Sequence, residues 1–390
     1  MTDFSLPFED DDAFASAGLR LTVDLGALVE NWRELARRSG KARTSAVVKA
    51  DAYGLGIEDV GETLYGAGAR DFFVATADEG ATLRLYAPEA RIFVLGGIWP
   101  GMERRFFEND LVPVIASEEQ LTFWMAVLSE YGDYPCALQV DTGFNRLGLP
   151  MDDAIALADD VSRPASFAPV LVMSHLACGD DPSNAMNRQQ LEAFRKVSAA
   201  FEGIEASLAN SAGIFLGPDY HFDLTRPGIA TYGGEAVPGM ANQMRPVATA
   251  EARIIQTRSV KAGETVGYGR ALQLTRDSRL AIVSAGYADG YMRSQSSAGV
   301  PLRQTGIPGG HGFIAGHKVP VAGRITMDLT IFDVTDLPGN LVRAGDYVEL
   351  FGSNISVDEA AKAAGTIGYE MLTSMGLRHE RRYISEEAEE

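Results

Sequence analysis

Short runs of hydrophobic residues recur between about residues 45 and 230, and most of them end in a cluster of small or polar residues. Eight such runs can be read along the chain: SAVVKADAYG, DFFVATAD, RIFVLGG, LVPVIAS, CALQVDTG, VLVMSHLACGD, IEASLANSAG and FDLTRPGIATYGG. Near-continuous hydrophobic runs of this length are typical of strands that are buried on both faces, as in a parallel sheet. We therefore expect a buried parallel sheet in this part of the chain.

Helical patterns fill most of the gaps between these runs. Over residues 24–40 hydrophobic side chains recur on one face at the helical period, with Asp24 as the expected N-cap and Gly40 as the C-terminal stop. Ser117 is followed three residues later by a glutamine, which predicts a capping box and a helix over 117–131. Alternating strands and helices predict an α/β fold, and eight strands fit a (β/α)8 TIM-type barrel. The pattern alone leaves a doubly wound sheet open.

After about residue 247 the pattern changes to β-type segments broken by glycine and aspartate turns. Two short helices are expected there, at 357–364 and at about 366–376. We therefore divide the chain into an acidic N-terminal tail (1–18), an N-terminal (β/α)8 barrel (19–247), a C-terminal mainly β domain (248–385) and a second acidic tail (386–390).

Charge narrows the range of partners. The chain has 390 residues and carries 34 Lys+Arg against 53 Asp+Glu, a formal net charge of −19. Almost half of this charge lies in the two tails, which we expect to be disordered. Acidity disfavours binding to nucleic acid or to an anionic membrane surface. No hydrophobic run approaches the ~20 residues that span a bilayer, no signal-peptide pattern begins the chain, and two cysteines make no disulfide framework, so we expect a cytoplasmic protein.

Lysine is scarce, with six residues against 28 arginines. Lys49 stands out because it ends the hydrophobic strand formed by residues 46–48. A buried lysine must be paired or must have a lowered pKa, and either condition makes it a candidate nucleophile. Its site would lie where catalytic groups gather in barrels, at the carboxyl ends of the strands.

Other polar residues occupy equivalent positions after later strands: Arg146, His175, Asn210, Ser211 and Arg226. The loops after the seventh and eighth strands also contain small residues suited to exposing backbone N–H groups to a phosphate. No metal site is expected, because the pair His175 and Cys178 lacks a second pair of ligands.

The segment AVVKADAYGLG at 46–56 resembles the pyridoxal-phosphate signature of bacterial alanine racemases. Further matches follow in the family's order: VDTGFNRLG, SHLACGD, ANSAG, RPGIATYG, GYADGYMR, GRITMD and TIGYEMLTSMGLR. The resemblance covers roughly 20–385. It implies a fold-type III enzyme, an isomerase that interconverts L- and D-alanine with pyridoxal 5'-phosphate. Such an enzyme would serve either D-alanine biosynthesis, which supplies a peptidoglycan precursor, or the use of D-alanine. It also implies a homodimer whose active site is shared between chains.

The resemblance also implies a two-base mechanism. Lys49 would hold the cofactor as a Schiff base and serve one face of the substrate α-carbon, and Tyr287 of the partner chain would serve the other. A tyrosine needs cationic neighbours to act near neutral pH, and His175 and Arg226 would supply them. Arg226 would face the pyridine nitrogen, where a guanidinium disfavours protonation and so favours a racemase over a decarboxylase.

The remaining residues carried over from the family bind the cofactor or the substrate. The cofactor-binding set is Lys49, Tyr53, Asn210, Ser211, Arg226, Gly228, Ile229 and Tyr369, and the substrate-binding set is Arg146, the backbone N–H of Met327, and Asp328. Many members carry a carbamylated lysine where this chain has Gln139, which could accept a hydrogen bond from Arg146 but brings no charge. A broader racemase acting on serine or basic amino acids therefore stays open. A non-catalytic cofactor-binding protein is less favoured, because it would need no second base.

Overall fold

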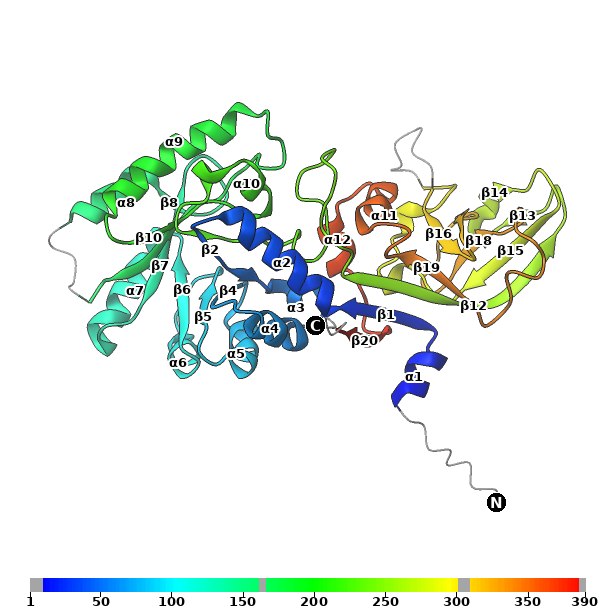
Figure 1. Cartoon of the computed structure of the whole chain (residues 1–390), viewed down its shortest axis with the longest axis horizontal. Helices are drawn as coiled ribbons and strands as arrows, with labels where there is room; N and C mark the ends of the chain where they lie inside the picture. The colour runs from blue at the N-terminus through cyan, green and yellow to red at the C-terminus, as the bar shows by residue number, and fades with distance from the viewer. Residues whose placement is uncertain (1–9, 161–165, 301–308, 386–390) are drawn as a thin grey trace, which may run out of the picture. The chain divides into compact units, whose positions relative to one another are not determined.

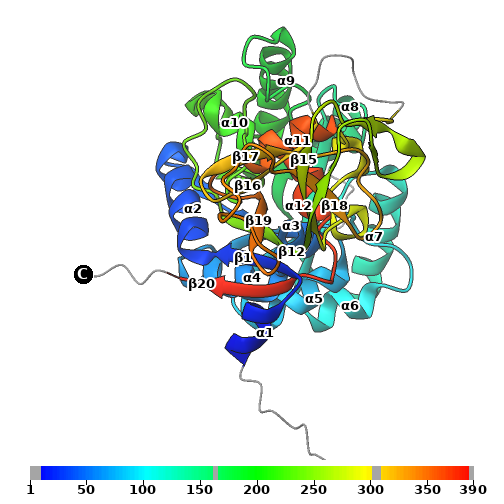
Figure 2. The ribbon, with the colours of Figure 1, turned by 90° about the vertical axis from the view of Figure 1, so that its right-hand side faces the viewer.

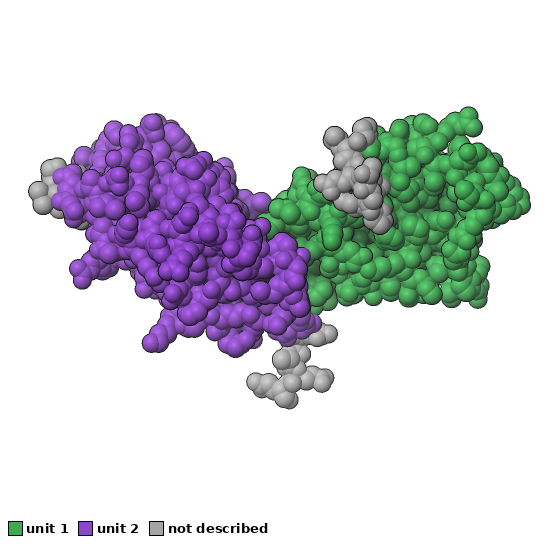
Figure 3. Space-filling view, turned by 90° about the horizontal axis from the view of Figure 1, so that it is seen from above, with its two compact units in different colours: residues 1–27, 246–390 green, residues 28–245 purple. Residues whose placement is uncertain are grey.

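The structure is a computed structural model that describes residues 10–160, 166–300 and 309–385. The chain divides into two compact units, which Figure 3 distinguishes by colour. Unit 2 comprises Leu28–Arg245, and unit 1 combines Met1–Ala27 with Pro246–Glu390. Each unit is described below by itself. No helix in the described parts of the chain is both long enough and apolar enough to cross a bilayer.

Unit 2 is built on a curled parallel sheet, around which its helices lie (Figure 1). Its strands follow the order β10 (Glu205–Ser207), β9 (Pro169–Met173), β7 (Cys136–Asp141), β6 (Leu111–Ile115), β5 (Arg91–Val94), β4 (Asp71–Val74) and β3 (Ala46–Val47), and β8 (Leu149–Pro150) pairs with β7. Their side chains are buried on both faces, as the hydrophobic runs predict; β6, for example, is buried throughout.

The last short strand closes this sheet. β11 (Leu224–Thr225) pairs in parallel with β2 (Arg43–Thr44), which runs directly into β3. On its other side, Asp223 N–H donates to the Ala206 carbonyl at 3.0 Å and Arg226 N–H donates to the Ala209 carbonyl at 2.8 Å. Each of the eight predicted segments thus contains a strand, and the TIM-type prediction is confirmed. The doubly wound alternative is wrong, because its sheet would stay open.

The helices of unit 2 begin close to where their caps predict. They are α2 (Leu25–Ser39), α3 (Lys49–Gly54), α4 (Ile57–Gly66), α5 (Ala77–Tyr86), α6 (Glu103–Glu108), α7 (Glu118–Tyr131), α8 (Met151–Asp159), α9 (Ala185–Ala200), α10 (Ser211–Phe215) and the 3-10 turn η1 (Pro218–Tyr220). Ser117 caps α7 by accepting from the Gln120 N–H at 3.2 Å. The Gln120 side chain does not complete the box, because its oxygen accepts from Ala116 N–H at 3.0 Å instead.

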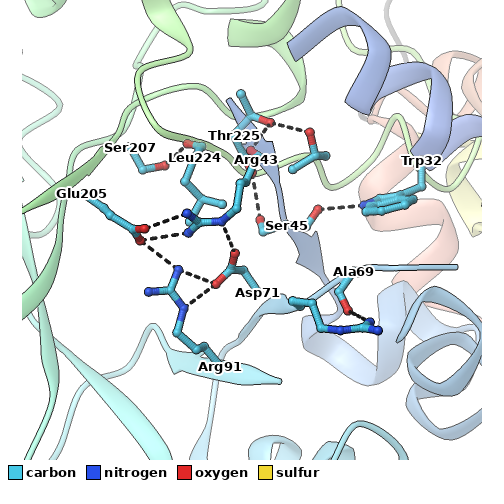
Figure 4. Close-up of polar contacts among 12 residues, drawn as sticks. Trp32, Arg43, Ser45, Ala69, Asp71, Arg91, Glu205, Ser207, Leu224 and Thr225 are labelled. Atoms are coloured by element: carbon cyan, nitrogen blue, oxygen red, sulfur yellow. Dashed lines mark hydrogen bonds and ion pairs between the residues drawn. The ribbon is translucent and has the colours of Figure 1, made fainter. Parts of the chain in front are cut away.

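Four charged side chains, each the first residue of its strand, are linked across the amino end of the barrel (Figure 4). Asp71 accepts from Arg43 Nε at 3.1 Å and from Arg91 Nε at 2.6 Å. Glu205 accepts from both terminal nitrogens of Arg43, at 2.6 and 2.9 Å, and from Arg91 Nη2 at 2.8 Å. We call these residues the basal ion-pair ring. The ring ties β2, β4, β5 and β10 together at the end opposite the predicted site.

Unit 1 is mainly β-structure, as predicted (Figure 2). Its larger sheet has the order β17 (His317–Pro320), β16 (His311–Ile314), β19 (Tyr347–Phe351), β12 (Ala248–Val260), β1 (Leu19–Asp24) and β20 (Glu380–Ile384), joined by β15 (Ser278–Val283) and β18 (Thr330–Asp333). The smaller elements are the pair β13 (Thr265–Val266) and β14 (Leu272–Gln273), the helices α11 (Val357–Ala364) and α12 (Gly368–Thr373), and the 3-10 turns η2 (Tyr268–Arg270), η3 (Tyr287–Asp289) and η4 (Arg293–Gln295).

The start of the chain departs from the predicted division. We assigned residues 19–247 to the barrel, but β1 pairs antiparallel with β12 and parallel with β20, so residues 19–24 form a strand of unit 1. Its alternating buried and half-buried positions suit a strand at one face of a packed sheet. Unit 1 is therefore made from both ends of the chain.

The predicted disordered tail is also partly wrong, because residues Asp10–Ser16 form the helix α1. Phe14 is buried, and the Arg20 guanidinium lies 5.1 Å from its ring. Arg20 Nε donates to the Phe14 carbonyl at 2.7 Å and Arg253 Nη2 donates to the Ala15 carbonyl at 2.7 Å, which satisfies the last carbonyls of the helix. The rest of the predicted tail at 1–9, and the tail at 386–390, lie outside the described residues.

Candidate active site

Lys49 follows β3 and begins a helical turn whose backbone is left-handed. The φ angles of the four residues Ala50–Tyr53 lie between 50° and 58°. A left-handed helical conformation costs roughly 1–2 kcal/mol for each L-residue, so the turn needs external support. Part of this support comes from Asp51, whose carbonyl accepts from Gly56 N–H at 3.0 Å and whose carboxylate accepts from Ile57 N–H at 2.8 Å. Backbone strain of this kind is found where a functional side chain has to be aimed.

The Lys49 amine is largely buried and has no hydrogen-bond or ion-pair partner among the described residues. Burial lowers its pKa from the ordinary value, and the positive charge of Arg146 lowers it further. The carboxylate of Glu79 opposes this by raising the pKa. A buried, unpaired amine with a lowered pKa is a nucleophile, which agrees with the role expected for Lys49.

Arg226 follows β11 and is buried in the barrel with 4% exposure. Its guanidinium donates to the Ser207 hydroxyl and to the Ser174 carbonyl, the latter at 2.6 Å. These bonds use only the two terminal nitrogens and leave Nε for a ligand. Burial lowers its pKa to about 9, which still leaves it charged at neutral pH. The Arg226 guanidinium thus has a fixed positive charge and no carboxylate partner in the described barrel. The family resemblance predicts such a group beside the pyridine nitrogen.

His175 follows β9 and lies among positive charges. Burial and the charges of Arg226, Arg146 and Lys49 lower its pKa to about 3. Its imidazole is therefore neutral at physiological pH in this setting, and its expected support of a tyrosine base stays a prediction. A neutral imidazole can still pass a hydrogen bond, with one nitrogen donating and the other accepting.

A glutamine that the sequence did not single out holds the His175 loop. Gln190 of α9 is fully buried, and its amide nitrogen donates to the His175 carbonyl at 2.9 Å. Its oxygen accepts from Ala177 N–H at 2.8 Å, and the same nitrogen lies 3.2 Å from the Thr142 hydroxyl. One side chain thus joins the loops after β7 and β9.

Arg146 lies in the loop after β7, where it is exposed. Its guanidinium lies 4.1 Å from the centroid of the Phe144 ring, and that ring packs edge-on against His175. Asp141 folds the loop, because its carboxylate accepts from the N–H groups of residues 143–145 at 2.7 to 2.9 Å. The guanidinium has no hydrogen-bond partner among the residues described, so it can receive a carboxylate from a substrate.

Gln139 is buried in β7, close to this loop in sequence. Its amide nitrogen donates to the Leu147 carbonyl at 3.0 Å, so the amide braces the backbone beyond Arg146. No hydrogen bond joins Gln139 to Arg146 in the described structure, which differs from the contact that we thought possible. The site consequently lacks both the carbamate charge and a direct amide partner for Arg146.

The loops after β10 and β11, where the sequence predicts a phosphate to bind, form a cradle. Asn210 caps α10 by accepting from Gly213 N–H at 2.9 Å, and the Ser211 hydroxyl accepts from Gly228 N–H at 2.8 Å. A Cβ on Gly228 would lie 2.1 Å from the Tyr53 hydroxyl, so only glycine leaves the tyrosine its place. The Ile229 N–H has no acceptor among the described residues. Hydroxyls and an open N–H can donate hydrogen bonds to a phosphate, and small residues let the phosphate approach the backbone.

In unit 1, Tyr287 and Met327 lie on two turns that are bonded to each other. Tyr287 N–H donates to the Thr326 carbonyl at 3.0 Å, and Ala288 N–H donates to the Met327 carbonyl at 3.1 Å. A Cβ on Gly286 would lie 2.3 Å from both carbonyl oxygens, so the close approach requires glycine. Tyr287 is 42% exposed and Met327 is 53% exposed. The Met327 N–H has no acceptor within the described structure, so it can still receive one from a ligand.

Arg378 joins the same two turns from a third segment. Its Nε donates to Asp289 at 2.6 Å and its Nη1 donates to Asp328 at 2.7 Å. The Asp328 carboxylate, which we expected to bind substrate, therefore braces the Met327 turn. Tyr369 lies half-buried in α12 of the same unit.

Comparison with known proteins identifies the family. The profile of "Alanine racemase, N-terminal domain" matches residues 23–236, and that of "Alanine racemase, C-terminal domain" matches residues 247–383. The chain belongs to the alanine racemase family. It is 73% identical to a protein of Agrobacterium fabrum named "Alanine racemase, biosynthetic", over 97% of each chain, and 63% identical to an alanine racemase of Rhizobium meliloti, over 95% of this chain and 98% of that one. The crystal structure of the alanine racemase of Bartonella henselae with covalently bound pyridoxal phosphate matches with a TM-score of 0.87 and 37% identity, over 94% of this chain and all of that one.

Within unit 2, the structure brings the residues of the alanine racemase motifs together. Unit 2 gathers Lys49, Tyr53, Arg146, His175, Asn210, Ser211, Arg226, Gly228 and Ile229 on loops that follow its strands, and unit 1 carries Tyr287, Met327, Asp328 and Tyr369. Residues that support them were missed: Glu79, Asp141, Gln190, Ser207 and Arg378. Gln190 left a signal, because it lies on the buried face of an amphipathic helix, where an amide must have partners. The described residues contain no group of three or more metal-ligating side chains.

Proposed function

We propose that this protein racemises alanine with pyridoxal 5'-phosphate, and that Lys49 and Tyr287 are its two bases. The observation that supports the proposal most directly is the Lys49 amine, which is buried, unpaired and lowered in pKa at the carboxyl end of a barrel strand. Membership of the alanine racemase family over nearly the full chain supports the substrate.

The residues present fit the cofactor. The amine of Lys49 would bind it covalently, and the cradle of Ser211, Gly228 and Ile229 would hold its phosphate, with Tyr53 at the cradle's edge. Arg226 would lie against the pyridine nitrogen through its open Nε. When bound, the cofactor withdraws electrons from the substrate α-carbon, so that the α-hydrogen becomes acidic enough to remove.

The protein's own groups then control the proton and the substrate. The Lys49 amine takes or returns the α-proton on one face, and the Tyr287 hydroxyl does so on the other, as a racemase requires. Arg146 and the Met327 N–H would hold the substrate carboxylate, which fixes the α-carbon between the two bases. Because the charged Arg226 guanidinium would disfavour protonation of the pyridine nitrogen, the ring would draw less charge from the α-carbon, which favours reprotonation over decarboxylation.

We further propose a homodimer in which the partner chain supplies Tyr287. Unit 1 exposes large hydrophobic residues on this turn and on the segments bonded to it: Tyr287, Met327, Leu329 and Leu377, the last 95% exposed. Exposed hydrophobic clusters of this kind mark interaction surfaces, and a second copy would cover them. A cytoplasmic location stays a prediction, which cell fractionation would test.

A biosynthetic role is favoured over a catabolic one. The 73% identity to a protein named biosynthetic exceeds the 42% identity to the protein named catabolic from the same organism, Agrobacterium fabrum.

The breadth of substrate specificity depends on how Arg146 is held. The Gln139 amide donates to a backbone carbonyl and not to Arg146, so Arg146 is held less firmly than a carbamate would hold it. Comparing turnover of L-alanine, L-serine and L-lysine would show whether this looser hold widens the substrate range.

The decisive experiment mixes two inactive variants. Lys49→Ala should lose the visible absorption of the bound cofactor, and Tyr287→Phe should keep that absorption while losing racemisation. If each site takes Lys49 and Tyr287 from different chains, subunit exchange between the variants should restore activity to roughly a quarter of wild type for statistical pairing. Retained cofactor absorption in Lys49→Ala would contradict its assignment, and absence of complementation after proven exchange would contradict the shared site.

A further inference from the structure

We propose that Glu79 is a positioning residue for Lys49, because its carboxylate anchors the left-handed turn that begins there and places a negative charge near the amine. The proposal rests on the function proposed above, since it concerns the residue assigned to hold the cofactor. Glu79 itself lies in the first turn of α5, which directly follows the adjacent βα loop.

The Glu79 carboxylate joins two loops of the barrel. One oxygen accepts from the N–H of Ala50, the residue after Lys49, at 2.7 Å. The other accepts from Ala75 N–H at 2.7 Å and from Thr76 N–H at 3.3 Å, at the carboxyl end of β4. Both oxygens are therefore bonded to backbone, and the first residue of the strained turn is tied to the neighbouring strand.

Helix capping alone does not account for this arrangement. Thr76 and Glu79 form a capping box, in which the threonine hydroxyl accepts from Glu79 N–H at 3.3 Å. A capping box requires only the bond from the glutamate to the Thr76 N–H, which is the longest of the three that Glu79 accepts. The two shorter bonds go to Ala50 and Ala75, outside α5, so the side chain is placed to reach the Lys49 turn.

The bond to Ala50 matters because the turn is strained. Four consecutive residues from Ala50 to Tyr53 are left-handed, a conformation that L-residues adopt only with support from their surroundings. The bond to Glu79 fixes the direction of the Ala50 N–H, which water would bind without holding the backbone in place. Loss of this anchor would let the turn relax and would move the Lys49 amine from its place.

The charge of Glu79 acts on the same amine. Burial and Arg146 lower the pKa of Lys49, and Glu79 is the group that raises it. His175 also faces these charges but is neutral, because its own pKa is lowered to about 3. The Asp51 carboxylate, two residues from Lys49, is bonded to Ile57 N–H. Removing the charge at Glu79 should therefore lower the pKa of the amine further.

Covalent attachment of the cofactor to the apoenzyme tests both effects without measuring racemisation. The rate constant for attachment is followed by absorbance across a range of pH, and reduction with borohydride followed by peptide mapping confirms that Lys49 is the residue labelled. In Glu79→Gln the midpoint of the pH dependence should fall by roughly half a pH unit or more, because a stabilising carboxylate is gone. The alkaline plateau should fall about tenfold, because the single amide oxygen of glutamine cannot accept from both the Ala50 and the Ala75 N–H, which weakens the hold on the amine.

Two neighbouring variants serve as controls. Asp78→Asn removes the same charge from the same helical turn, but Asp78 pairs with Arg105 and is 74% exposed, so its pH profile should match wild type. Thr76→Ala removes the helix cap while leaving the Glu79–Ala50 bond, so it should lower thermal stability without moving the midpoint.

The outcomes separate this inference from the proposed function. If wild type does not attach the cofactor at Lys49, the proposed function fails. If wild type attaches it there and Glu79→Gln keeps the wild-type midpoint and plateau, the role of Glu79 is refuted alone. Should Glu79→Gln fail to fold, Glu79→Asp keeps the charge but is too short to reach Ala50. It should then lower the plateau and keep the midpoint, and a wild-type plateau in Glu79→Asp would equally refute the anchoring role.

Discussion

The basal ion-pair ring predicts a stability cost for Glu205→Gln that depends on pH. Glu205 accepts three hydrogen bonds from Arg43 and Arg91, and the bonds from Arg43 are the main reason that its pKa is lowered to about 2. When the Glu205 charge is removed, Asp71 is the only carboxylate left in the ring to pair with the two guanidinium groups. Glutamine keeps the shape of the side chain and one acceptor, so the variant removes mainly the charge.

The magnitude follows from the difference between the folded and unfolded carboxyl groups. Lowering a pKa from 4.5 to about 2 corresponds to at most ~3.5 kcal/mol at about 1.4 kcal/mol per pH unit. The Glu205 side chain is 30% exposed and that of Arg43 is 48% exposed, so solvent screens the pair. We therefore expect Glu205→Gln to lower the free energy of unfolding by about 1–2 kcal/mol at neutral pH.

The sign of the pH dependence is fixed by the lowered pKa. Above the unfolded value of 4.5 the stabilisation is fully present, and it is lost as the pH falls toward the folded value of about 2. The difference between wild type and Glu205→Gln should therefore narrow when unfolding at neutral pH is compared with unfolding near pH ~4.

Urea unfolding followed by tryptophan fluorescence measures this directly. All three tryptophans of the chain, Trp32, Trp99 and Trp124, lie in unit 2, so the signal reports on the barrel. Glu192→Gln is the matched control, because its exposed pair with Arg188 on α9 should contribute less than about 0.5 kcal/mol. Equal losses in the two variants, or a loss at Glu205 that does not narrow at acid pH, would refute the reasoning.

Three further predictions concern the site. Gly228→Ala should weaken cofactor binding at least tenfold, as equilibrium dialysis would show, because its Cβ would lie 2.1 Å from the Tyr53 hydroxyl; unchanged affinity would contradict the cradle. Gln190→Leu should destabilise the barrel by about 2–3 kcal/mol and lower kcat, since the His175 loop loses its buried partners; chemical denaturation and initial rates measure both. Gly286→Ala should lower kcat by at least tenfold with cofactor absorption retained, because the second base is displaced.

Much of the barrel follows from the hydrophobic pattern, because parallel strands buried on both faces leave unbroken hydrophobic runs. The division between units does not follow from it. β1 is a short alternating strand, and its pairing with β12 and β20 joins residues more than 200 positions apart. Nor could α1 be expected, since the cations that cap it come from Arg20 and from the distant Arg253. Local patterns indicate a strand or helix, whereas its partner is decided by packing.

The chemical residues of the site were predictable and their supports were not. Lys49, Arg226 and His175 each disrupt a hydrophobic segment, and the family motifs name them. Their partners are ordinary in sequence: Ser207 reads as a strand residue and Glu79 as a helix cap. The neutral state of His175 was also beyond sequence, because it depends on three cations from other loops.

The two ends of the barrel differ in function: one end carries stabilising ion pairs, and the other carries the candidate active site. The basal ion-pair ring uses the first residues of four strands, where charges can pair without disturbing any ligand. The other end holds an amine and two guanidinium groups that have no bonded carboxylate in the described chain, so that they stay available to ligands. It also holds a turn of four left-handed residues. Cations left unpaired destabilise the apoprotein, and an anionic cofactor that binds only the folded chain would recover that free energy. The unfolding free energy of the holoenzyme should therefore exceed that of the apoenzyme by more than Glu205→Gln removes.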